Sequence, residues 1–271
     1  RTPSAEARII QIGMDPLYSR YPVRGFPTDG ALAGAPRLTL AALAAALKPL
    51  VDAKVVAERR RKWEAEAVEQ RDAVATRARA VSGDSPIDMA WASRCVADCI
   101  DDNTIVVNEY DLDSSQTRMR VPGSYFGSSP AGGLGWALGA ALGARLAAPG
   151  KTVISCMGDG TYIFGSPTAS HWVSRAYQIP ALFVVFNNRA WNAVKRSVAS
   201  LAKDGWAMRA ETMPLYQLDP APDYEMVCRA SGGWGEKVED PAALPGVLKK
   251  ALDVVRNEKR QALVNIICKK P

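Results

Sequence analysis

Two short apolar runs stand out along the chain, TVISCM at residues 152–157 and ALFVVF at residues 181–186. Each has the length and β-branched content of a buried strand, and the interval between them is long enough for a helix. Further apolar runs, TIVVNE at residues 104–109 and QALVNIICK at residues 261–269, are separated from these by Ala/Leu-rich or amphipathic helix patterns. Strands that alternate with helices predict an α/β fold in which helices flank a parallel sheet.

The first third of the chain has a different pattern. Residues 7–16 predict a buried strand and residues 38–50 an Ala/Leu helix, with a Gly/Pro-rich loop between them. One strand and one helix cannot bury a core alone, so we expect residues 1–50 to be the tail of a preceding α/β domain. Residues 51–86 carry many charges of both signs and predict a solvated helical connector. Residues 87–271 then form the main domain.

Composition narrows the function classes. The 271 residues are 48% hydrophobic and carry a net charge of +6, but the Lys and Arg residues are scattered and form no basic stripe. We therefore expect no nucleic-acid partner. No apolar run reaches the 18 or more residues of a membrane span, and there is no signal-peptide pattern, so we expect no membrane association. The odd number of cysteines and their spacing do not suggest a disulfide framework, which favours a cytoplasmic location.

Polar residues with metal-binding character follow the first two apolar runs. GDG at residues 158–160 combines a carboxylate with two glycines that permit a tight turn and close backbone approach, and Asn188 ends the second run. The carboxyl ends of parallel strands are where α/β proteins bind ligands. Hard oxygen ligands beside a turn that can approach phosphate predict a site for Mg²⁺ and a diphosphate.

Five short motifs together resemble a known family. They are NE at 108–109, PGSY at 122–125, AGGLG at 131–135, GDG at 158–160 and NN at 187–188. Their order and separations are similar to those in the diphosphate-binding domain of thiamine-diphosphate enzymes, in the branch of acetolactate synthase and benzoylformate decarboxylase. The resemblance covers residues 87–271 and implies the thiamine-diphosphate-binding fold, and it makes residues 1–50 similar to the end of that family's middle domain.

The resemblance also implies roles for individual residues. Asp159 and Asn188 would coordinate Mg²⁺ through their side chains, and Ala190 through its backbone carbonyl. Gly132 would accept a hydrogen bond from the pyrimidine amino group, and Leu134 would hold the cofactor in its bent shape. The full set of implied cofactor-binding residues is Asp111, Leu112, Gly132, Gly133, Leu134, Gly158, Gly160, Thr161 and Trp191.

Several features depart from the family pattern. Asp111 stands where relatives often place hydroxyl groups toward the diphosphate, and its charge would repel phosphate. Arg196 and Ser197 replace an aromatic pair that helps to line the benzoylformate pocket, which disfavours an aryl substrate. His171, the only histidine, is expected to be structural, and Tyr162 and Phe164 are expected to pack in a lid or an interface.

The resemblance implies a decarboxylase of a small 2-oxo acid, or a carboligase of the acetolactate synthase type. In this family the glutamate that activates the cofactor lies on a separate pyrimidine-binding domain, so we assign no catalytic residue to this chain. We expect that domain to come from another chain or another part of the polypeptide, in a homo- or hetero-oligomer, dimer or tetramer. FAD as a second cofactor is left open.

Three alternatives remain at this point. The first is a non-catalytic or regulatory module that binds thiamine diphosphate. The second is a 2-hydroxyacyl-CoA lyase, which we favour less because the sequence after the last predicted strand offers no obvious CoA site. The third is a nucleotide-binding α/β domain that uses GDG for another phosphate ligand.

Overall fold

The computed structural model describes residues 3–23, 25–127 and 132–270. The chain divides into two compact units, Arg1–Val68 and Glu69–Pro271. The division falls within α2 (Ala53–Ala80), the long helix that occupies most of the predicted connector.

The first unit is small and open. Its strands β1 (Ile10–Gly13) and β2 (Gly30–Ala33) pair in parallel and are followed by α1 (Pro36–Leu47). No described residue of this unit is buried, and even the apolar residues of α1 are exposed, with Leu38 70% accessible. The unit therefore has secondary structure but no core of its own.

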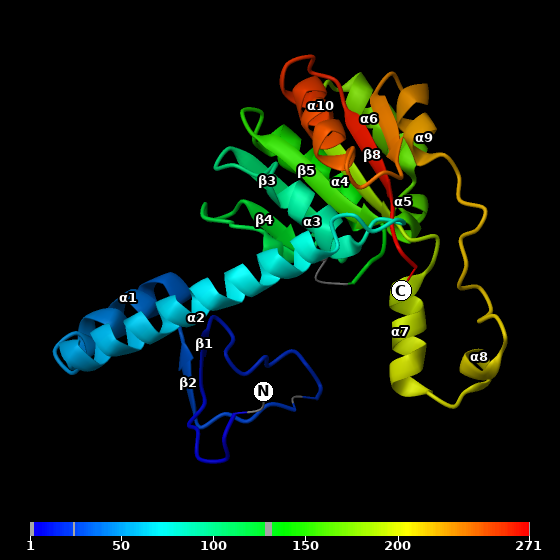
Figure 1. Ribbon diagram of the computed structural model, residues 1–271. Coiled ribbons are helices and arrows are strands. Elements are labelled where there is room, and N and C mark those ends of the chain that lie inside the picture. The colour runs from blue at the N-terminus through cyan, green and yellow to red at the C-terminus, as the bar shows by residue number, and fades with distance from the viewer. Residues whose placement is uncertain (1–2, 24, 128–131, 271) are drawn as a thin grey trace. The chain divides into compact units, whose positions relative to one another are not determined.

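The second unit is built on a six-stranded sheet in which all paired strands are parallel (Figure 1). The strand order is β4-β3-β5-β6-β8-β7. Their bounds are β3 (Thr104–Glu109), β4 (Tyr125–Gly127), β5 (Thr152–Gly158), β6 (Leu182–Asn187), β7 (Trp234–Val238) and β8 (Ala262–Ile267). The sheet and its flanking helices confirm the predicted fold class.

Helices cover both faces of this sheet. Helices α3 (Met89–Ala97) and α10 (Leu244–Arg256) pack on one face, against side chains such as Val106, Ile154 and Val184. Side chains one position away, such as Val107 and Val153, point to the other face. That face is covered by α4 (Trp136–Ala147), α5 (Asp159–Phe164), α6 (Pro167–Ala176) and α9 (Tyr224–Ala230). Because both faces are buried, the central strands are almost continuously apolar.

The remaining elements are the edge strand β4, a 3₁₀ turn and two helices that follow β6. Edge strand β4 is only three residues long and half exposed, so the sequence pattern did not reveal it. A 3₁₀ turn spans Ser114–Gln116, and helices α7 (Asn192–Leu201) and α8 (Trp206–Arg209) follow β6. Among the described residues, no helix has the length and apolar character needed to cross a membrane.

Candidate functional site

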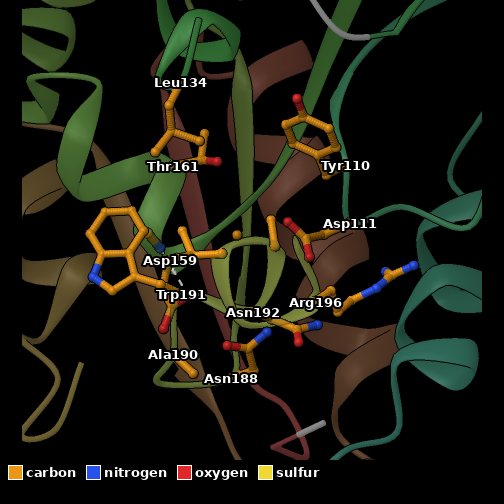
Figure 2. Close-up of a pocket in the computed structure, with 14 residues that line it drawn as sticks. Tyr110, Asp111, Leu134, Asp159, Thr161, Asn188, Ala190, Trp191, Asn192 and Arg196 are labelled. Atoms are coloured by element: carbon orange, nitrogen blue, oxygen red, sulfur yellow. Dashed lines mark hydrogen bonds between the residues drawn. The ribbon is translucent and has the colours of Figure 1, made fainter. Parts of the chain in front are cut away.

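The carboxyl ends of β3, β5 and β6 lie side by side in the sheet and open into a cavity of about 170 Å³ (Figure 2). This is the edge at which the sequence predicted a ligand. Its lining residues come from the loops after β3 and β6, from the end of β5 and the first turn of α5, from the segment before α4 and from α7. They are Tyr110, Asp111, Leu134, Gly158, Asp159, Gly160, Thr161, Asn188, Ala190, Trp191, Asn192, Ala193, Val194 and Arg196.

Two oxygen atoms in this cavity lack hydrogen-bond partners. Asp159 and Asn188 are 1% and 2% exposed, and Oδ2 of Asp159 and Oδ1 of Asn188 are buried with no partner. The other carboxylate oxygen of Asp159 accepts a hydrogen bond from the Gly160 N–H at 2.9 Å. Burial raises the pKa of Asp159 to about 6, although backbone N–H groups oppose the shift. Buried hydrogen-bond acceptors without a partner lower the stability of the fold. Carboxylate and amide oxygens are also the hard ligands that Mg²⁺ prefers.

Asn187, the last residue of β6, and Asn188, which follows it, have different surroundings. The Asn187 side chain donates to Oδ1 of Asn265 at 3.1 Å and accepts from the Arg189 N–H at 3.2 Å. Asn265 in turn donates to Glu225 at 2.9 Å. Asn187 is therefore held in a buried structural network, while the side-chain oxygen of Asn188 has no hydrogen-bond partner among the described residues.

Glu109 fixes the start of α4, next to Leu134. Its carboxylate is 1% exposed and accepts hydrogen bonds from the Gly135 and Ala137 N–H groups at 2.8 and 2.7 Å. A carboxylate at a helix N-terminus satisfies otherwise unpaired donors and complements the helix dipole. Gly135 has a φ of +84° and packs on Gly165, where an added Cβ would lie 2.6 Å from the Gly165 Cα. Both carboxylate oxygens of Glu109 are thus engaged in holding the segment at the start of α4.

The turn after β3 brings a second carboxylate to the cavity. The Asn108 side chain donates to the Leu112 carbonyl at 2.9 Å and accepts from the Leu112 N–H at 3.1 Å, which closes the turn. Asp111 then lies over Gly158, where an added Cβ would lie 2.6 Å from the Asp111 carboxylate. Burial, followed by the charges of Asp159 and Glu109, raises the pKa of Asp111 to about 7.

Gly160 and Trp191 are in close contact. A Cβ at Gly160 would lie 2.6 Å from the indole ring of Trp191, so only glycine fits beneath the ring. The backbone N–H of Trp191 donates a hydrogen bond to the backbone carbonyl of Tyr216 at 2.8 Å. This bond connects this part of the cavity wall to the segment before α9.

The structure brings together nine of the sequence-predicted site residues around the cavity. These are Asp111, Leu134, Gly158, Asp159, Gly160, Thr161, Asn188, Ala190 and Trp191. Gly132, Gly133 and Leu112 do not line it; Leu112 is 3% exposed and packs in the core beneath the turn. Within the AGGLG motif, Ala131 lies outside the described residues.

Other lining residues were not predicted as ligand contacts. Tyr110, Asn192, Ala193 and Val194 line the cavity, as does Arg196, which the sequence singled out only as a replacement. Asn192, Ala193, Val194 and Arg196 share the first turns of α7. Helical spacing directly after NN is the signal that could have located them.

His171 belongs to α6 and lies in a buried hydrogen-bond network. Its ring nitrogens lie 2.8 Å from the Tyr162 hydroxyl and 2.7 Å from Oε1 of Gln261. Tyr162 is fully buried, so its expected place in a lid or interface is wrong; it packs against the rings of His171 and Tyr224. Phe164, two residues later, is 63% exposed.

No group of three or more His, Cys, Asp or Glu side chains suited to a metal occurs in the described part of the chain. A cation site here would therefore combine carboxylate, amide and backbone oxygens. Asp159, Asn188 and the Ala190 carbonyl have that chemistry, which is typical of sites that bind Mg²⁺ together with a phosphate ligand.

Residues 110–266 match the family described as "Thiamine pyrophosphate enzyme, C-terminal TPP binding domain". The matched segment begins at the turn after β3 and ends in β8, so it includes every residue that lines the cavity.

Individual relatives agree with this match. Over 154 residues, 55% of this chain, the sequence is 33% identical to an acetolactate synthase large subunit of Mycobacterium tuberculosis and covers 26% of that protein. Over 80 residues, 30% of this chain, it is 41% identical to a benzoylformate decarboxylase of Pseudomonas aeruginosa and covers 15% of it. The chain spans about a quarter or less of the length of these relatives.

A solved structure has the same fold. The thiamine diphosphate-dependent 4-hydroxybenzoylformate decarboxylase of Rhodococcus jostii RHA1 superposes with a TM-score of 0.58 at 25% sequence identity. The superposition covers 70% of this chain and 33% of the decarboxylase.

Proposed function

Because this chain belongs to the thiamine pyrophosphate enzymes through their C-terminal TPP-binding domain, we propose that its cavity binds Mg²⁺ and the diphosphate of thiamine diphosphate. The observation that carries this proposal is the pair of unpartnered oxygens on Asp159 and Asn188, two buried residues that line the same cavity in the matched domain. A bound cation would supply the partner that each oxygen lacks.

The proposed roles follow the positions of the residues around the cavity. Asp159, Asn188 and the Ala190 carbonyl hold Mg²⁺, while Gly158, Gly160 and Thr161 form the wall beside the diphosphate. Leu134 presents an apolar side chain to the cavity from the segment that Glu109 fixes. Bound thiamine diphosphate supplies the carbanion chemistry of the reaction, and the protein supplies orientation and exclusion of water.

We further propose that the reaction is decarboxylation of a small 2-oxo acid, with or without ligation of the product to a second carbonyl compound. The family assignment and the two enzyme types among the relatives support this class. The polar and cationic side chains of Asn192 and Arg196 in the cavity favour an aliphatic substrate over an aryl one.

Activity requires, in this proposal, a pyrimidine-binding domain from another chain or another part of the polypeptide. Among the described lining residues, only Asp111 and Asp159 carry carboxyl groups. Glu109 is committed to α4. The family's activating glutamate therefore has no counterpart among these residues.

We also propose that residues 1–50 belong to a neighbouring middle domain and that residues 51–86 connect it to the cofactor domain of residues 87–271. The exposed apolar face of α1 supports this organisation, since Leu38, Leu40 and Leu43 have no core to enter within their own unit.

A turnover assay tests the catalytic part of this proposal. The chain alone, supplied with thiamine diphosphate, Mg²⁺ and pyruvate, should release CO₂ no faster than the same mixture without protein. Calorimetry on the same sample should still detect cofactor binding, which shows that the site is folded. Robust turnover by the chain alone would contradict the need for a pyrimidine-binding domain.

A further inference from the structure

Two carboxyl groups, those of Asp111 and Asp159, line the cavity of the proposed diphosphate site. The strand register pairs Glu109 of β3 with Met157 of β5, and Asp111 and Asp159 each follow two residues later. Both line the same cavity, and Figure 2 shows them approaching it from different sides. Asp111 is held there by the turn that Asn108 closes and by its contact with Gly158.

No described lysine or arginine neutralises this pair. Salt bridges occur elsewhere in the described residues, but none involves Asp111 or Asp159. Arg196 lines the cavity but has an exposed side chain and no salt bridge of its own. Above pH 7, where both carboxyl groups are ionised, an unneutralised pair of carboxylates attracts a divalent cation and repels an anionic ligand.

We propose that Asp111 makes this site take up its divalent cation before the diphosphate and lowers its affinity for the diphosphate. This inference rests on the proposed function and concerns the order and strength of cofactor loading. The charge of Asp111 adds to that of Asp159 when the cation binds alone. The same charge opposes the diphosphate, which arrives at the already formed cation site.

The Asp111→Asn variant separates the two effects because it removes the charge and keeps the size of the side chain. At pH 8, where Asp111 is ionised, the affinity of the full chain for Mn²⁺ in the absence of cofactor should weaken roughly tenfold, as measured by electron paramagnetic resonance of the free ion. The affinity for thiamine diphosphate at saturating Mg²⁺, measured by calorimetry, should increase about three- to tenfold. Asp111→Ser should shift both affinities in the same directions.

Asp102→Asn is the matched control. Asp102 is exposed and lies just before β3, at the opposite end of the strand from the cavity, and its substitution changes the net charge equally. It should leave both affinities at the wild-type values. Thermal unfolding of each variant verifies that it is folded before titration.

The outcomes distinguish this inference from the proposed function. If the unmodified chain binds Mn²⁺ and thiamine diphosphate but both Asp111 variants match it, the role of Asp111 is wrong and the proposed function stands. The same conclusion follows if the two affinities change in the same direction. If the unmodified chain binds neither probe, the proposed function and this inference fall together.

Discussion

At the residue scale, the buried carboxylate of Asp159 lowers the stability of the ligand-free fold. Its carboxylate is almost completely buried, one of its oxygens has no partner, and burial raises its pKa to about 6. Ionising such a group without a cation costs free energy, because the folded state holds the charge less well than water does. A ligand that neutralises the charge should recover this cost.

We predict opposite effects of Asp159→Asn on stability and on binding. The free energy of unfolding of the ligand-free chain at pH 7 should rise by about 1–3 kcal/mol, since the buried charge is removed. The thermal stabilisation by thiamine diphosphate and Mg²⁺ should disappear. Urea unfolding and thermal melts measure the two quantities; a variant that loses ligand-free stability, or that keeps the stabilisation by cofactor, contradicts the assigned role.

Glu109 should behave differently, because its carboxylate has good partners. In Glu109→Gln the amide carbonyl can accept only one of the two hydrogen bonds, and the amide nitrogen then faces a donor N–H of α4. The free energy of unfolding should fall by about 2 kcal/mol. Glu211→Gln, at an exposed position, should leave it unchanged. Equal stability of the two variants in urea unfolding would show that Glu109 does not hold the start of α4.

At the scale of the elements, the buried Tyr162–His171–Gln261 network ties α5 and α6 to the segment before β8. Burial lowers the pKa of His171, and the hydrogen bond to Gln261 only partly opposes this. The unfolded chain therefore binds a proton more readily than the folded chain does. The contribution of neutral His171 to the free energy of unfolding is fully present above the unfolded-state pKa of about 6.5. It is lost as the pH falls below that value.

This gives a prediction for pH. Between pH 7.5 and 5.5 the wild-type chain should lose about 1 kcal/mol more of its free energy of unfolding than the His171→Gln variant. Taking the difference between the two proteins removes the contributions of carboxylates such as Asp159, which titrate in both. Urea unfolding at the two pH values measures the effect, and parallel pH profiles would rule out a neutral buried imidazole.

The sequence predicted the central elements well because their patterns are strong. The apolar runs became β3, β5, β6 and β8, and the polar residues that follow the first three line the cavity. The sequence pattern did not predict edge strand β4, because a short and largely exposed strand has no apolar run. The prediction for Tyr162 was wrong because its burial depends on packing against His171 in the next helix and against Tyr224, which is distant in the sequence, and periodicity cannot report such packing.

The distinction between Asn187 and Asn188 also could not come from the sequence pattern alone. Both residues are amides at the end of the same strand, and alternation along a strand points them in opposite directions without saying which direction holds the ligand. The structure separates them through Asn265, which engages only Asn187.

At the scale of the whole chain, the two units differ in how complete they are. The second unit has apolar clusters on both faces of its sheet, whereas no described residue of the first unit is buried. The cavity belongs entirely to the second unit. Binding of the cofactor's diphosphate should therefore require only groups within that unit, while turnover should require a further domain.

The most direct test of the account is a calorimetric titration of thiamine diphosphate into the chain, once with Mg²⁺ and once with EDTA. We expect saturable binding of one equivalent with Mg²⁺ and no measurable binding with EDTA, because in the proposed site Asp159 and Asn188 would hold the cation that binds together with the diphosphate. Absence of binding in both titrations, or binding that persists unchanged in EDTA, would contradict the proposed site.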